Sequence, residues 1–164
     1  HTGLTAGFAF VEEVRQFWDG PIALGGAISS GRAIRAAETL GAELAYLGTA
    51  FIACEESIAD PAYKDMVVGA SAEDILPSKG ITGVTANWLR KSLIAAGYDP
   101  ANMPEDKKPN FENTQDNSKA WKNVWSAGQG VGAVTAVEPI AQIVARLKAE
   151  YDFACKLPRF DMKE

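Results

Sequence analysis

Two pairs of residues near the start of the chain have the types and positions needed to hold a phosphate through backbone amides. Gly25 and Gly26 close one apolar run, and Gly48 and Thr49 close the next. Where a strand ends at glycines and a helix follows, the amides and the positive end of the helix dipole point at one place, which suits an anion. The sequence therefore predicts a phosphate held by backbone donors rather than by charged side chains.

A single glycine turn of this kind is weak evidence, because glycines between a strand and a helix more often serve the turn alone. Two such turns are stronger evidence, since consecutive strand–helix loops late in a barrel commonly share one phosphate site. A Rossmann dinucleotide site is the alternative. It requires GxGxxG at the turn and a carboxylate at the end of the next strand, and the sequence has neither. Nicotinamide binding by a Rossmann fold is therefore not expected.

The segment between the two glycine turns has the pattern of a helix between two buried strands. Small apolar residues recur at i, i+3, i+4 and i+7 over 33–40, and Gly41 predicts the C-terminal end of that helix. The flanking runs 21–24 and 44–47 are apolar on both faces, which is typical of parallel strands covered by helices. The unit is therefore predicted to be βαβ.

Beyond residue 54 the sequence predicts helices joined by irregular segments. Asp60 followed by Pro61 is typical of a helix start, and Pro139 opens an apolar stripe of helical period. The polar stretch 98–117 has no hydrophobic period, and we expect a functional loop such as a lid there. The predicted helices of this region are 61–68, 87–96, 118–126 and the one that follows Pro139.

Composition and charge limit the possible partners. Sixteen Lys and Arg against twenty-one Asp and Glu give a net charge of −5, without a long block of either sign. Nucleic acid and membrane are therefore not expected as partners, and no apolar stretch reaches the roughly 20 residues of a membrane span. Cys54 and Cys155 lack metal-ligand spacing, so we expect two reduced thiols in a cytoplasmic protein and no metal site.

Several other conspicuous residues are predicted to be structural. Large aromatic side chains at helical spacing more often anchor a core than stack on a cofactor, which applies to Trp88, Trp121 and Trp125. The remaining candidates are expected to be surface charges without a catalytic role: Arg32, Lys64 and, at a solvated helix start, Glu55 and Glu56.

An ordered series of motifs resembles the nitronate monooxygenase (2-nitropropane dioxygenase) family of FMN-dependent (β/α)8 barrels. It includes GGAISSGR at 25–32, LGTAF at 47–51, NWLR at 87–90 and WSAGQG at 125–130. The resemblance implies an α/β fold that is the C-terminal portion of an FMN-binding TIM barrel, with its last two βα units and an added helical segment. It implies three parts: the last βα units with the FMN phosphate site at 1–54, a helical or irregular insertion or lid at 55–137, and a C-terminal helix packing on the barrel at 138–164.

The same resemblance implies which residues hold the cofactor. In this family the FMN phosphate lies on the two glycine loops, and a glycine-rich turn lies beside the flavin. The implied FMN-binding residues are Gly25, Gly26, Gly48, Thr49, Gly128 and Gln129. The family commonly has Ala-Gly-Gly before the isoleucine, whereas this chain has glycines followed by Ala27, which still supplies an amide.

His1 is the implied catalytic residue. The family carries Gly-His-x-Gly at the barrel mouth, and His1-Thr2-Gly3 matches its last three positions. A neutral imidazole suits removal of the proton α to a nitro group. The match implies that six barrel strands precede this chain, so we expect the N-terminal part of the barrel as a partner, in another chain, a cleaved fragment or an upstream segment.

The function implied by the resemblance is an FMN-dependent oxidoreductase. It would oxidatively denitrify alkyl nitronates or nitroalkanes, with O2 reoxidising the flavin. An alternative on the same site is an NAD(P)H-dependent FMN reductase of quinones or enoyl thioesters, of the enoyl-ACP reductase type. From another class, the chain could be a non-catalytic fragment that binds a phosphate ligand.

Overall fold

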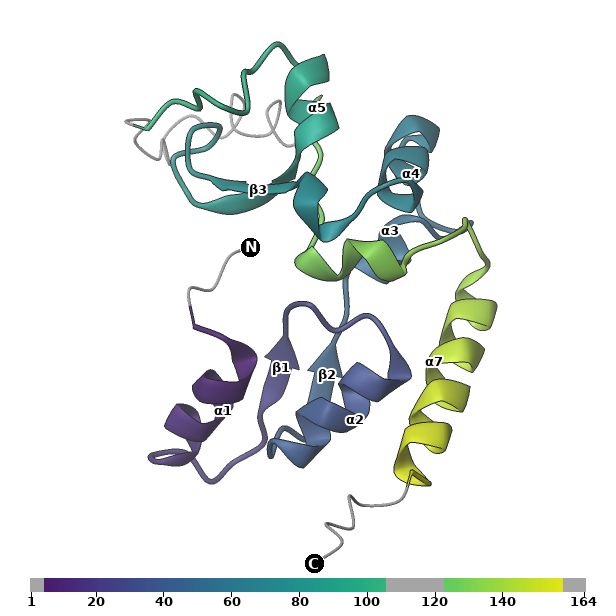
Figure 1. Ribbon diagram of the computed structural model, residues 1–164. Coiled ribbons are helices and arrows are strands. Elements are labelled where there is room, and N and C mark those ends of the chain that lie inside the picture. Colours follow the sequence, from purple (N-terminus) through teal and green to yellow (C-terminus); the bar gives the residue numbers. More distant parts are fainter. Residues whose placement is uncertain (1–4, 106–122, 158–164) are drawn as a thin grey trace, which may run out of the picture.

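A computed structural model describes residues 5–105 and 123–157 of the chain, and these form a mixed α/β structure (Figure 1). Two short strands pair in parallel in one part, and two others pair antiparallel in a second part. In chain order the elements are α1 Gly7–Arg15, β1 Ala23–Gly25, α2 Gly31–Thr39, β2 Leu44–Tyr46, α3 Thr49–Ile52, α4 Pro61–Val68, η1 Ala72–Asp74, β3 Ile75–Ser78, β4 Ala86–Leu89, α5 Arg90–Ala95, η2 Gln129–Ala133 and α7 Ile140–Cys155.

The predicted βαβ unit is confirmed. Strands β1 and β2 are parallel, with Ala23 opposite Leu44, and α2 connects them. The hydroxyl of Ser30 accepts the amide of Ala33 at 3.2 Å and caps the start of α2. Gly41 follows the helix with a φ of +102°, a left-handed conformation that glycine adopts without a Cβ clash.

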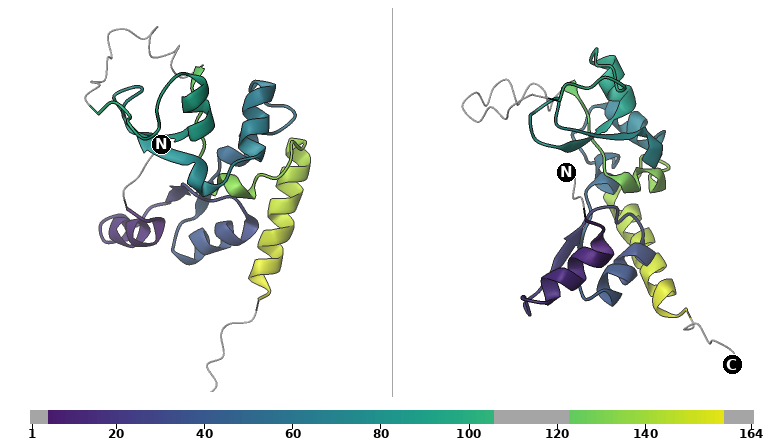
Figure 2. Two further views of the ribbon diagram at one scale, coloured as in Figure 1. Left: turned by 45° about the horizontal axis from the view of Figure 1, so that its top comes forward. Right: turned by 60° about the vertical axis from the view of Figure 1, so that its left-hand side comes forward.

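Helix α7 runs alongside α2 at very short range (Figures 1 and 2). A Cβ on Gly31 would lie 2.2 Å from the carbonyl oxygen of Leu147 and 2.2 Å from the amide nitrogen of Tyr151. The absence of a side chain at Gly31 therefore lets the two backbones approach. A small core of Ala50, Cys54, Ile143 and Leu147 joins α7 to α3.

Helix α1 was not among the predicted elements. Its one buried residue is Val11. Its Arg15 forms hydrogen bonds with both loops that precede the parallel strands. The Arg15 guanidinium donates to the carbonyl oxygen of Gly20 at 2.6 Å, to the carbonyl oxygen of Gly41, and to the Glu43 carboxylate at 2.6 Å.

The prediction of a helix over 87–96 is wrong in its first part. Residues Ala86–Leu89 form β4, which pairs antiparallel with β3, and the helix begins only at Arg90. All four residues of β4 are buried, and Trp88 also bridges Ser126. Pairing on both sides overrides a local spacing that suits a helix. Ser126 is correspondingly in this bridge rather than in the predicted helix 118–126, most of which lies outside the described residues.

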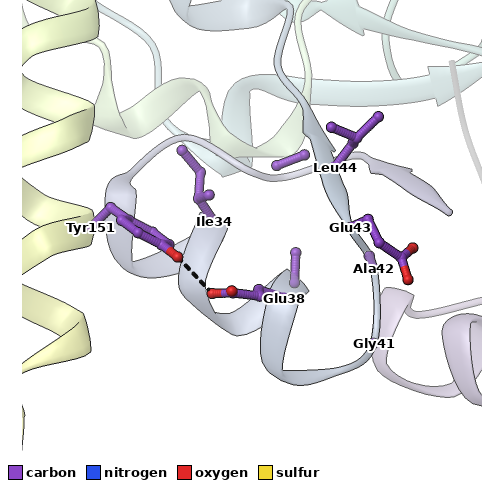
Figure 3. Close-up of a pocket in the computed structure, with 9 residues that line it drawn as sticks. Ile34, Glu38, Gly41, Ala42, Glu43, Leu44 and Tyr151 are labelled. Carbon is purple, nitrogen blue, oxygen red and sulfur yellow. Dashed lines mark hydrogen bonds between the residues drawn. The ribbon is translucent and has the colours of Figure 1, made fainter. Parts of the chain in front are cut away.

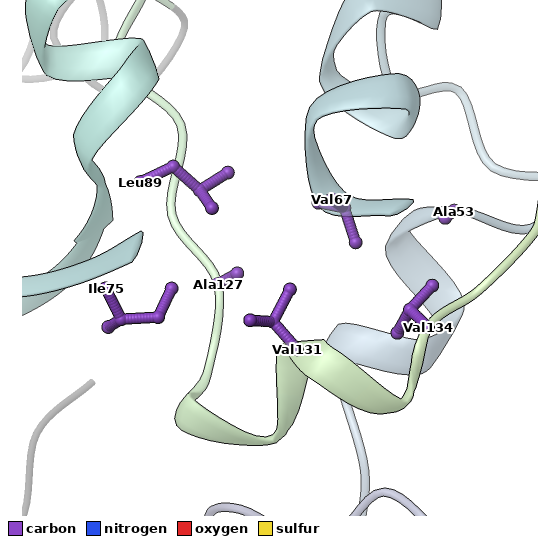
Figure 4. Close-up of a cluster of buried hydrophobic side chains, with 7 residues drawn as sticks. All are labelled: Ala53, Val67, Ile75, Leu89, Ala127, Val131 and Val134. Carbon is purple, nitrogen blue, oxygen red and sulfur yellow. The ribbon is translucent and has the colours of Figure 1, made fainter. Parts of the chain in front are cut away.

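A second core connects the antiparallel strands to the rest of the molecule (Figure 4). Its members come from segments spread over the chain, namely Ala53, Val67, Ile75, Leu89, Ala127, Val131 and Val134. The predicted helices at Pro61–Val68 and after Pro139 are confirmed, with Asp60 accepting the amide of Ala62 as the N-cap. Among the described helices, none has the length and apolar character needed to cross a bilayer.

Candidate functional site

The two predicted glycine loops lie side by side. Because β1 and β2 are parallel and Gly25 is in register with Tyr46, both strands end at the same edge of the sheet. Gly25 and Gly26 are exposed at the end of β1, and Gly48 is exposed after β2. The structure thus brings together the residues that the sequence predicted would share one ligand.

The first loop has an unusual backbone. Gly26 has a φ of +114°, and Ala27 is the non-glycine residue with a left-handed φ, 54°, within the described ranges. A left-handed alanine is strained, and such residues gather where the surrounding structure or a ligand fixes them. The loop therefore has a defined shape of its own before it turns into α2.

The second loop leaves a space that residues 5–105 and 123–157 do not fill. A Cβ on Gly48 would meet nothing within 4 Å, and the same is true of Gly26. Gly26 needs to be glycine for its φ, but Gly48 has a φ of −122° that other residues adopt. Within the described residues, neither the backbone conformation nor side-chain packing accounts for glycine at 48. Close approach of a ligand to the backbone does explain it, and this observation fits a phosphate held by amides.

A third segment closes over both loops. The amide of Gly128 donates to the Thr49 hydroxyl at 2.8 Å. A Cβ on Gly130 would lie 2.8 Å from the Ser29 hydroxyl and 3.2 Å from the carbonyl oxygen of Ala27. The predicted site residue Gln129 lies between these two contacts and is exposed. Six of the predicted site residues therefore meet in one place.

The start of α2 contributes less to this place than the sequence suggested. Its first amide, that of Gly31, already donates to the Glu150 carboxylate at 2.8 Å, and the Ser30 hydroxyl is turned inward to cap the helix. A carboxylate on the helix N-terminus satisfies part of the helix dipole. The donors that remain for a ligand are those of the loops themselves.

Helix α4 packs against the residues that lead into the third segment, Trp125 and Ser126. Tyr63 stacks on Trp125 with ring centroids 5.1 Å apart, and its hydroxyl donates to the carbonyl oxygen of Ser126. Burial raises the pKa of the Tyr63 phenol, which keeps it a protonated donor. The ammonium of Lys64 donates to the carbonyl oxygen of Cys54 at 2.7 Å. Lys64 is half-buried, and its bonds to the carbonyl oxygens of Cys54 and Glu55 hold the turn that follows α3.

Other predicted structural residues are now placed. The Glu56 carboxylate accepts the amide of Ile140 at 2.9 Å and caps α7, so it does not begin a solvated helix. Trp88 is fully buried in the core, as predicted. The guanidinium of Arg32 lies 5.5 Å from the centroid of the Phe153 ring. Trp121 and the predicted base His1 lie outside the described residues.

An open pocket of about 410 Å³ lies at the opposite end of the parallel sheet (Figure 3). The Tyr151 hydroxyl donates to the Glu38 carboxylate at 2.8 Å, and this hydrogen bond raises the pKa of Tyr151 to about 12. The pKa of Glu38 is lowered by the same bond and by Arg35. Glu38 and Glu43 line this pocket, so its acidic character disfavours an anion.

Both cysteines are free, with Cys54 buried and Cys155 exposed. Over residues 5–105 and 123–157 there is no group of three or more His, Cys, Asp or Glu side chains placed to hold a metal ion.

Comparison with known proteins shows which family the sequence resembles. The family model described as "Nitronate monooxygenase" matches residues 1–150. A nitronate monooxygenase of Paraburkholderia phytofirmans is 31% identical over 137 residues, covering 79% of this chain and 37% of that protein. One from Pseudomonas aeruginosa is 30% identical over 142 residues, covering 79% of this chain and 39% of that protein. The chain thus spans about two fifths of the length of these relatives.

Solved structures give the same picture of the fold. FabK from Thermotoga maritima superposes with a TM-score of 0.71 at 26% identity, covering 95% of this chain and 52% of that chain. Nitroalkane oxidase from Streptomyces ansochromogenes superposes with a TM-score of 0.70 at 27% identity, covering 90% of this chain and 44% of that chain. The whole described fold is therefore similar to about half of a larger α/β protein.

Proposed function

The chain belongs to the nitronate monooxygenase family, and on that premise we propose that it supplies the cofactor-phosphate region of an FMN-dependent oxidoreductase that oxidises alkyl nitronates with O2. The observation that carries the proposal is the open space over Gly48, beside a second loop whose Gly26 amide lies at the same sheet edge. Backbone amides at the start of a loop with open space beside it suit a phosphate monoester.

We propose further that β1 and β2 are the last two strands of a (β/α)8 barrel. Leu44 and Tyr46 are 63% and 73% exposed, and they share one face of the sheet because they are two residues apart. A barrel interior would bury this face, and neighbouring strands would pair with the two open edges. The remainder of the barrel would come from a further segment, in this chain or in a second one.

Within that barrel, different residues of this chain would bind the phosphate, contact the flavin and remove the substrate proton. Amides of Gly25, Gly26, Gly48 and Thr49 would hold the phosphate, and Gly128 with Gln129 would lie beside the flavin. Bound FMN supplies the electron acceptor that oxidises the substrate and is reoxidised by O2. His1 would remove the α proton of a neutral nitroalkane at its imidazole nitrogen, acting as a general base.

A second candidate function uses the same site. It is NAD(P)H-dependent reduction of quinones or enoyl thioesters through FMN, and the similarity to FabK favours it as the alternative. A non-catalytic phosphate-binding role is the third. All three place a phosphate on the glycine loops. The first two differ in what reduces the flavin, and the third involves no flavin chemistry.

The test uses the full-length protein. Its visible spectrum and the mass of the cofactor released on denaturation identify FMN. Anaerobic stopped-flow mixing with an alkyl nitronate, and separately with NADH, then shows which one reduces the flavin. Reduction by the nitronate supports the proposal, reduction by NADH alone selects the reductase, and a colourless protein that does not take up FMN refutes both.

A further inference from the structure

The short helix η2 has two different sides. Val131 is fully buried in the core that joins α4, β3 and β4, as Figure 4 shows. The other side rests on the glycine loops, where Gly128 contacts Thr49 and Gly130 contacts Ser29. The segment therefore connects the proposed phosphate site to the antiparallel strands through a few residues.

The Thr49 hydroxyl is at the centre of this connection. It accepts the Gly128 amide at 2.8 Å, and a hydroxyl that accepts one hydrogen bond keeps its own proton to donate. Thr49 is the first residue of α3 and follows Gly48, over which the structure is open. A phosphate in the open space over Gly48 would therefore lie beside the residue that carries this proton.

We propose that Thr49 is a positioning residue that ties η2 to the occupied phosphate site. Its hydroxyl donates to the cofactor phosphate while it accepts the Gly128 amide, so binding of the phosphate holds η2 in place. This inference rests on the proposed function, since it requires a phosphate at the glycine loops. The coupling is reciprocal, because a well-placed η2 orients the Thr49 hydroxyl for the phosphate.

Two cofactor forms separate this role from a merely structural one. FMN and riboflavin share the isoalloxazine ring and the ribityl chain, and only FMN carries the phosphate. If Thr49 had a structural role alone, FMN and riboflavin would slow amide exchange in η2 equally. If Thr49 couples η2 to the phosphate, FMN slows amide exchange in η2 about 10-fold more than riboflavin does. This factor is within the usual range of coupling between sites.

The experiment is hydrogen exchange followed by mass spectrometry on the full-length protein without ligand, with FMN and with riboflavin. Exchange is read in peptides covering 125–134 for the wild type, Thr49→Ser and Thr49→Val. Thr39→Val is the matched control, because the Thr39 hydroxyl donates to the carbonyl oxygen of Arg35 at 2.8 Å, a hydrogen bond within α2. Dissociation constants for both ligands are measured by fluorescence titration of the same four proteins.

We expect FMN to slow exchange over 125–134 about 10-fold more than riboflavin does in the wild type, in Thr49→Ser and in Thr39→Val. In Thr49→Val this difference disappears, and the dissociation constant rises by about 10-fold or more for FMN but not for riboflavin. An equal effect of FMN and riboflavin on the wild type overturns the inference, as does a difference that persists in Thr49→Val. A wild type that binds neither flavin overturns the proposed function together with it.

Discussion

Gly48→Ala is the sharpest perturbation of the proposed phosphate site, because it adds one methyl group where the described part of the chain has nothing within 4 Å. The φ of −122° at this position is open to alanine, so the folded chain accommodates the methyl group without a clash. The free energy of unfolding should change by no more than about 0.5 kcal/mol, as for an ordinary surface substitution.

The effect on the cofactor should be much larger than the effect on folding. The methyl group would hold the phosphate away from the neighbouring amides, and a hydrogen bond to a charged group contributes about 1.5–3 kcal/mol. Loss of one such bond raises the dissociation constant for FMN by about 10- to 150-fold, since 1.4 kcal/mol is about tenfold. Riboflavin, which has no phosphate, should bind the variant as it binds the wild type.

The assay is titration of the apoprotein with FMN, followed by quenching of flavin fluorescence. Gly69→Ala is the control, because Gly69 ends α4 with a φ of −89° and a Cβ there would make an ordinary 3.5 Å contact with the carbonyl oxygen of Asp65. Gly26→Ala would be a poorer test, because its φ of +114° penalises alanine without any ligand. Unchanged FMN affinity in Gly48→Ala would refute the assignment of the phosphate to this space.

Three further outcomes are expected. Gly31→Ala should lower Tm, because its Cβ would lie 2.2 Å from backbone atoms of Leu147 and Tyr151 and overpacking costs about 1–3 kcal/mol; a Tm equal to that of the wild type would contradict the close approach of α2 and α7. His1→Asn should slow turnover of neutral nitroalkanes by about 10²- to 10⁴-fold while a preformed nitronate still reduces the flavin; equal losses on both substrates would assign His1 a binding role instead. In ultraviolet titration, Tyr151 should ionise near pH 12, because its hydrogen bond to Glu38 favours the protonated phenol. The contribution of this hydrogen bond to stability is therefore present below about pH 10 and is lost as the pH rises towards 12. Tyr151→Phe should remove the titration step near pH 12, and a spectrum unchanged by the substitution would show that another tyrosine was responsible.

Local sequence predicted the parallel unit well and the antiparallel strands poorly. The runs before Gly25 and Gly48 are apolar on both faces, and Gly41 ends the helix between them, so each local signal agreed with the fold. At Ala86–Leu89 the local signal disagreed with the fold. The apolar residues there continue the helical spacing of α5, but the segment forms a strand. Their strand conformation depends on pairing with β3 and with Ser126, which local spacing does not contain.

The candidate site divides in the same way. That the two glycine loops meet follows from parallel pairing, which the sequence predicted. The contact between Gly128 and Thr49 joins residues 79 positions apart, and the one between Glu150 and Gly31 joins residues 119 positions apart. A carboxylate on an exposed helix face gives no sign that it will satisfy a distant amide. For this reason the start of α2 was expected to be available for a ligand, although Glu150 already accepts its first amide.

Because α7 packs against the start of α2, it also supports the glycine loop that leads into α2. Three contacts depend on docking of α7 at once: the carboxylate on the Gly31 amide, the backbone approach at Gly31, and the Tyr151 hydroxyl on Glu38. Contacts so close together open as one unit. A protease that nicks α7 would therefore release the start of α2 and, with it, the strained turn at Ala27 that α2 anchors. Damage more than a hundred residues along the chain would thus reach the glycine loop that we propose to hold the cofactor phosphate.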